Sequence, residues 1–129
     1  MSICNQEQEK EAYIVNQEAL NELRKLKNQE QTVYETMQNL GSLDLSFVEW
    51  QFLNEEAFRI LDKKYFKLFK GIAVGKILDL AKSYLECLAV YNLVEKDSGK
   101  VAKVLEKMKK MTKSEREKQE MEYLIEKNA

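Results

Sequence analysis

The stretch from Val74 to Val94, VGKILDLAKSYLECLAVYNLV, carries apolar residues on nearly every side of an ideal helix. A helix that is apolar all round belongs in the middle of a helical bundle. Four charged residues interrupt the run, Lys76, Asp79, Lys82 and Glu86, and they argue against an ordinary transmembrane span. We therefore predict a helix over residues 74–94 at the centre of a helical domain.

The composition of the whole chain agrees with this prediction. The 129 residues suffice for one domain, and 44% of them are apolar while 33% are charged. The chain has no proline and only four glycines, whereas a β-rich domain needs many turn residues. We predict an all-α fold, a single domain over residues 1–129 built as a small bundle of about four helices. Its N-terminal helix is long and its C-terminal helix is weakly held.

The N-terminal part of the chain predicts a long acidic helix over residues 6–39. Apolar residues recur every seventh position, at Ala12, Ala19, Leu26, Val33 and Leu40. Such a helix would be about 50 Å long, whereas a compact domain of this size is about 35–40 Å across. The helix therefore protrudes, bends or packs against another chain. The candidate protein interface comprises Leu23, Leu26, Val33, Tyr34 and Met37, and its partner is another protein or a second copy in a homodimer.

Turn and capping signals divide the rest of the chain. A capping box at Ser46 and Glu49 opens a helix over 47–70, which follows a C-cap at Gly41. Gly71 is interpreted as the stop before helix 74–94, and the alternative is a close helix contact at Gly71 and Gly75 within one continuing helix. Basic C-terminal helices over residues 100–127 complete the chain. One covers 100–111, and a second capping box at Ser114 and Glu117 opens the last helix, which runs to Lys127. Trp50 and Cys87 are expected in the core of residues 47–94.

The residue types argue against catalysis and metal binding. The chain has no histidine, the commonest general base and metal ligand, and its two cysteines, Cys4 and Cys87, make neither a zinc site nor a disulfide framework. The glycines are scattered and form no phosphate-binding loop. We therefore expect no enzyme activity, no catalytic residues, no metal and no cofactor. No secretory signal opens the chain, so a cytoplasmic location is expected.

Charge is unevenly distributed along the chain. Residues 1–58 carry a net charge of −7 and residues 59–129 one of +6. Two basic rows at helical spacing form a candidate nucleic-acid patch, namely Arg59, Lys63, Lys67, Lys70, Lys100, Lys103, Lys107 and Lys110. The rows contain almost no arginine to read base edges, and lysine also covers the wet face of any amphipathic helix. Alternatively, the acidic first helix lies against the basic helices, within one chain or across a dimer.

These patterns favour a non-catalytic helical protein–protein interaction module, an adaptor, regulator or inhibitor that acts through helix surfaces. Nucleic-acid binding through the lysine rows is the alternative. No membrane partner is expected.

Overall fold

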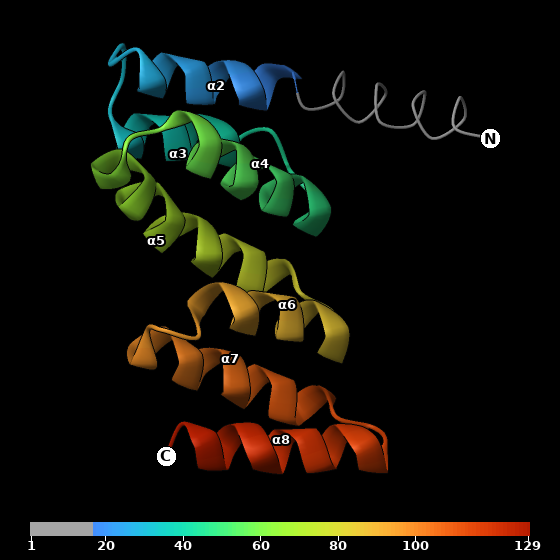
Figure 1. Ribbon diagram of the computed structural model, residues 1–129. Coiled ribbons are helices and arrows are strands. Elements are labelled where there is room, and N and C mark those ends of the chain that lie inside the picture. Colours follow the sequence, from blue (N-terminus) through green and yellow to red (C-terminus); the bar gives the residue numbers. More distant parts are fainter. Residues whose placement is uncertain (1–16) are drawn as a thin grey trace, which may run out of the picture. The chain divides into compact units, whose positions relative to one another are not determined.

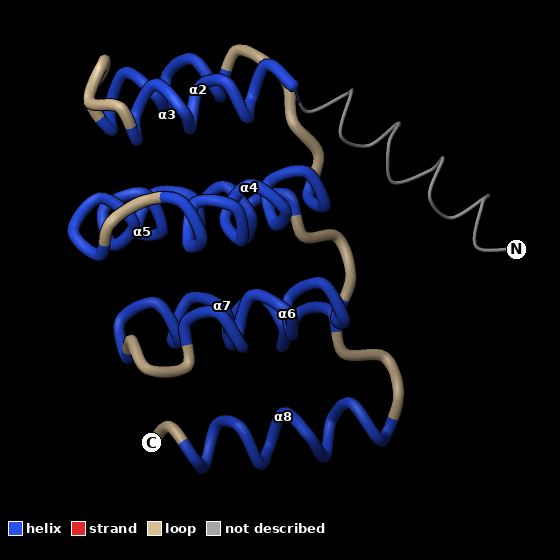
Figure 2. The backbone as a smooth tube through the Cα atoms, turned by 45° about the horizontal axis from the view of Figure 1, so that its top comes forward, coloured by secondary structure: helices blue, strands red, loops and turns tan. Residues whose placement is uncertain are grey.

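The computed structural model describes residues 17–129, and these residues form α-helices and no strand (Figures 1 and 2). The helices are α2 (Gln17–Lys27), α3 (Val33–Gly41), α4 (Phe47–Ile60), α5 (Lys63–Leu80), α6 (Tyr84–Val94), α7 (Ser98–Met111) and α8 (Glu115–Lys127). The predicted all-α class is confirmed. The described part of the chain has seven helices, so the predicted count of about four is wrong.

The chain forms two compact units. The first ends at Ala73 and the second spans Val74–Ala129, so α5 contributes residues to both. In the first unit α2 packs against α3 and α4, and in the second α7 packs against α6 and α8. Connections of two to five residues join successive helices, a length typical of antiparallel helix neighbours. The prediction of one domain over the whole chain stays a prediction.

The predicted helix over residues 6–39 is interrupted, which corrects the first expectation. Residues 6–16 lie outside the described part, and α2 ends at Lys27 in a Schellman motif. Gln29 adopts the left-handed conformation with φ of 60°, and the Glu30 N–H donates to the Lys25 carbonyl at 2.8 Å. Thr32 then caps α3 in a capping box with Glu35. The seven-residue spacing therefore continues across a helical hairpin, not along one 50 Å helix.

The boundaries of the middle helices also differ from the prediction. Helix α4 ends at Ile60, and Asp62 accepts a hydrogen bond from the Tyr65 N–H at 2.9 Å as α5 begins. Helix α5 then continues through Gly71, so the predicted stop there is wrong. A Cβ added at Gly75 would meet nothing within 4 Å, which excludes a close helix contact at that glycine. The chain breaks instead before α6, where Ser83 accepts from the Glu86 N–H at 3.1 Å.

Several local predictions are confirmed. Ser46 and Glu49 form the predicted capping box of α4, and the Ser114 side chain accepts from the Glu117 N–H at the start of α8. Trp50 and Cys87 are both buried. Because a capping residue satisfies backbone groups within one turn of itself, these boundaries depend on local sequence alone.

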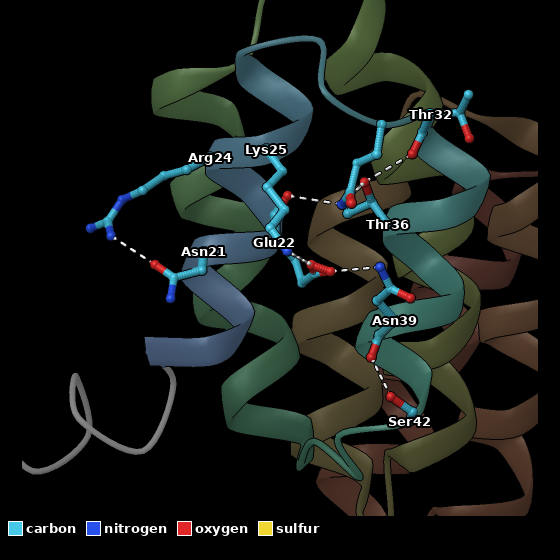
Figure 3. A network of polar contacts seen from close by, with 9 residues as sticks. Asn21, Glu22, Arg24, Lys25, Thr32, Thr36, Asn39 and Ser42 are labelled. Atoms are coloured by element: carbon cyan, nitrogen blue, oxygen red, sulfur yellow. Dashed lines mark hydrogen bonds and ion pairs between the residues drawn. The ribbon is translucent and has the colours of Figure 1, made fainter.

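A polar network joins the two helices of the α2–α3 hairpin (Figure 3). Asn39 donates its side-chain N–H to the Glu22 carboxylate at 2.6 Å, and Gln31 donates to the Thr36 hydroxyl at 2.8 Å. Glu22 is only 8% exposed, and burial of a polar group is costly unless hydrogen-bond partners satisfy it. Lys25 lies 3.7 Å from the second carboxylate oxygen. The network therefore fixes α3 against α2.

Candidate interaction surfaces

The candidate protein interface on the predicted first helix is mostly covered by its own unit. Leu23, Leu26, Val33 and Met37 are buried, with exposed fractions of 7% or less. Only Tyr34 points to solvent, with 79% of its surface exposed. Four of the five residues of the predicted interface are therefore covered by their own chain and do not form a surface open to a partner. The four buried residues belong to the core of the first unit, and Tyr34 stays a candidate for contact with a partner.

A different apolar side chain is exposed where α4 meets α5. Phe58, in the last turn of α4, is 70% exposed. Its ring contacts Phe66 of α5 edge to face, with ring centroids 5.3 Å apart and planes at 71°. Phe66 is half-buried and holds the Phe58 ring from one side. An edge-to-face aromatic pair contributes about 0.5–1.5 kcal/mol beyond area burial, so the exposed ring is kept in place.

Four lysines lie beside this aromatic pair in the sequence of α5. Residues 63–70 read KKYFKLFK and contain no carboxylate. Lys63, Phe66, Lys67 and Lys70 share one face of α5, because they follow at three- and four-residue spacing. We call Phe58, Arg59, Lys63, Phe66, Lys67 and Lys70 the α4–α5 corner. Sequence reasoning identified its basic residues but did not single out Phe58. The sequence does contain a signal for the exposure of Phe58. Leu53 and Ala57 are buried and mark the core face of α4, and Phe58 lies beside that face, not on it.

The first basic row is not one continuous stripe. Arg59 belongs to α4 while its three lysines belong to α5. The Arg59 guanidinium donates to the Glu56 carboxylate at 2.6 Å. Lys63 and Lys67 are exposed, whereas Lys70 is half-buried. The lysine ammonium groups therefore supply most of the positive charge that this row offers to a ligand.

The second basic row lies along α7 and consists of Lys100, Lys103, Lys107 and Lys110. Part of this row stabilises the fold. Lys107 donates to the backbone carbonyls of Leu78 and, at 3.3 Å, Asp79, in the last turn of α5. A cation there satisfies carbonyls that have no intrahelical partner and complements the helix dipole. Lys100 lies 4.0 Å from the Asp97 carboxylate. Sequence reasoning did not foresee the role of Lys107, because the α5 terminus was placed ten residues earlier.

A cavity of about 430 Å³ borders the second row. Its lining includes Lys103, Lys107 and Lys110, together with Asp79 and Glu106. The two acidic side chains and the α5 carbonyls oppose an anion at this position. The cavity is therefore a poor phosphate site despite its lysines.

An apolar groove of about 420 Å³ runs between α7 and α8. It is lined mainly by Val101, Ala102, Leu105 and Ile125, and Ile125 is 43% exposed. Lys109 and Glu106 stand at its rim with opposite charges. The groove therefore favours neither an acidic nor a basic ligand.

Two side chains of the second unit, Tyr84 and Cys87, have raised pKa values. Burial raises the pKa of the Cys87 thiol above its ordinary value of 9.0, against the opposing effect of Lys107. Burial also raises the pKa of Tyr84, and the hydrogen bond from its hydroxyl to Glu120 adds to the shift. Because the thiolate is the nucleophile, a raised pKa makes Cys87 unreactive. It is a core residue, packed with its sulfur 3.5 Å from that of Met111.

Across residues 17–129 no group of three or more histidine, cysteine, aspartate or glutamate side chains is arranged to hold a metal ion. Within the same residues, no helix combines the length and the apolar character that crossing a bilayer requires.

Comparison with known proteins gives no match: neither a family model, nor a curated protein, nor a solved structure is similar to this chain.

Proposed function

We propose that the chain is a non-catalytic protein–protein interaction module, acting in the cytoplasm as an adaptor, regulator or inhibitor, and that the α4–α5 corner is its main contact surface. The observation that supports the proposal is the exposed ring of Phe58 held by Phe66. Aromatic side chains are enriched in protein interfaces and often dominate their binding energy. A ring already fixed by a neighbour loses little conformational entropy when a partner covers it.

Affinity capture with a matched pair of variants tests this proposal. The tagged full chain retains partner proteins from an extract of its source cells, and Phe58→Ser abolishes their retention. Leu68→Ser is the control, because Leu68 is 53% exposed but lies on another face of α5 from Phe66. Equal retention by both variants, or no protein retained by the unmodified chain, would contradict the proposal. Circular dichroism checks that both variants stay folded.

Self-association is one form of the same proposal. A second copy contacting Tyr34 or Phe58 would make both residues part of a dimer interface. Light scattering of the unmodified chain over a range of concentrations gives the oligomeric state. A dimer requires that Tyr34→Ser or Phe58→Ser lowers the apparent mass, and a constant monomer mass excludes it.

Nucleic-acid binding through the lysine rows is the second candidate. The exposed side chains of Lys63, Lys67, Lys103 and Lys110 support it. The ion pair of Arg59 and the capping role of Lys107 weaken it, because these two cations already have partners. Excess absorbance at 260 nm in the purified protein, lost on nuclease treatment, would favour this candidate over the first.

A further inference from the structure

The α4–α5 corner combines a single exposed aromatic side chain with a concentrated positive charge. Phe58 offers most of its ring to solvent, and residues 63–70 of the adjoining helix carry four lysines. Three carboxylates lie within four residues of Phe58, and one of them, Glu55, is exposed on α4. Glu56 is paired with Arg59, and Asp62 accepts the Tyr65 N–H at the start of α5. The negative charge at this corner therefore lies on the α4 side, and the α5 side, residues 63–70, is cationic because it contains no carboxylate.

From these features we infer that the α4–α5 corner binds an acidic segment of a partner protein that inserts one large apolar side chain against Phe58. The inference rests on the proposed function and names the chemistry of its partner. Carboxylates of such a segment would face Lys63, Lys67 and Lys70, which follow one another on one helix face at three- and four-residue spacing. Complementary charge raises the association rate and selects the partner, while the buried aromatic contact supplies most of the affinity.

The same features disfavour a nucleic acid as the occupant. Binding of single strands uses several exposed aromatic platforms on which successive bases stack. The corner offers one, because Phe66 is half-buried and turns its ring at 71° to that of Phe58. Reading of base edges relies mainly on arginine, and the Arg59 guanidinium is bound to Glu56. A protein segment can instead place a few carboxylates where the lysines of α5 are and keep them away from Glu55 and Asp62.

Two synthetic peptides of opposite charge test the inference on the full chain. Both are 16 residues long with one central phenylalanine, and their charged positions are all glutamate in one and all lysine in the other. Fluorescence anisotropy is expected to show the acidic peptide binding at least about tenfold more tightly, a preference that added salt reduces. Equal affinity for the two peptides, no binding of either, or equal binding of a 16-nucleotide oligo(dT) would overturn the inference.

Variants assign the binding to the corner. Lys63→Glu combined with Lys67→Glu should reverse the preference between the acidic and the basic peptide. Phe58→Ser should weaken the binding of both peptides. Lys103→Glu combined with Lys110→Glu makes the same charge change on α7 and leaves the preference intact. If the α7 variant has the same effect as the α5 variant, binding depends only on the net charge of the chain, and the inference is overturned. All four substituted lysines are exposed, so these variants should fold, and circular dichroism verifies it.

The outcomes separate this inference from the function on which it rests. If Phe58→Ser abolishes capture of cellular proteins but the peptides show no charge preference, the chain is an interaction module whose partner is not acidic. If Phe58→Ser leaves capture unchanged, the proposed function itself is wrong. A fall in the mass of the protein alone on Phe58→Ser would identify the occupant as a second copy and overturn the assignment to a partner protein.

Discussion

Two rows of lysines with the same helical spacing have different surroundings in this protein. On α5 the row lies beside the exposed ring of Phe58 and its half-buried neighbour Phe66, and on α7 the central lysine donates to the carbonyls that end another helix. Lysines at such spacing are usually interpreted as a solvated face or a phosphate-binding surface. The comparison shows that the role of a lysine depends on the groups that surround its ammonium group, and not on helical spacing alone.

The first test compares the exposed ring of Phe58, in the α4–α5 corner, with a buried ring next to the corner in the sequence. Phe69, one residue from Lys70, is fully buried. Phe69→Ala should lower the free energy of unfolding by about 3–5 kcal/mol, because it removes a large core side chain and leaves a cavity. Phe58→Ala should cost only about 0.5–1.5 kcal/mol, the value of its edge-to-face contact. Urea denaturation measures both, and equal losses would place Phe58 in the core.

The second prediction concerns the lysines of α7. Lys107→Met removes the charged donor from the Leu78 and Asp79 carbonyls, and the free energy of unfolding should fall by about 1.5–3 kcal/mol. Lys103→Met is the matched control on the same helix, and as an exposed residue it should change stability by no more than about 0.5 kcal/mol. If the two variants were equally stable, Lys107 would be an ordinary surface lysine.

A smaller effect is expected at the hairpin between α2 and α3. Thr32 accepts the Glu35 N–H at 3.1 Å and caps α3. Thr32→Ala should cost about 1 kcal/mol of stability, and Thr32→Ser should restore most of it because the hydroxyl is kept. No loss on Thr32→Ala, measured by thermal denaturation, would contradict the break that turns the predicted long helix into a hairpin.

The hairpin also shows what the sequence could and could not predict. Thr32 and Glu35 have the spacing of a capping box, so the start of α3 could have been found from sequence alone. The end of α2 was harder to find, because Gln29 takes a left-handed conformation that usually belongs to glycine. The apolar repeat continued across the break, and the periodicity alone suggested one helix.

One glycine led to the opposite error. Gly71 suggested a helix end, yet α5 continues through it, and the chain breaks at Leu61 and before Ser83 instead. The capping signals at Ser46 and Ser114 were reliable because they depend on neighbouring residues only. The surface of the α4–α5 corner depends on the contact between two helices, which no local pattern specifies.

The smallest expected effect is on the pH dependence of stability in the second unit. The pKa values of Cys87 and Tyr84 are raised in the folded protein, so the unfolded chain loses these protons first as the pH rises. The unfolding free energy should therefore be unaffected by these groups well below pH 9, and it should fall as the pH rises through the ordinary pKa values of the thiol, 9.0, and of the tyrosine, 10.0. Cys87→Ala and Tyr84→Phe should each reduce this alkaline loss. An unchanged alkaline slope in both variants would contradict the assigned shifts.

The most direct test of the contrast between the two lysine rows is nuclear magnetic resonance of the ¹⁵N-labelled full chain, titrated with the acidic peptide. Our account predicts that amide shifts concentrate between Phe58 and Lys70 and that the amides of Lys103 to Lys110 move little. Shifts concentrated on α7, or spread evenly over both rows, would contradict it.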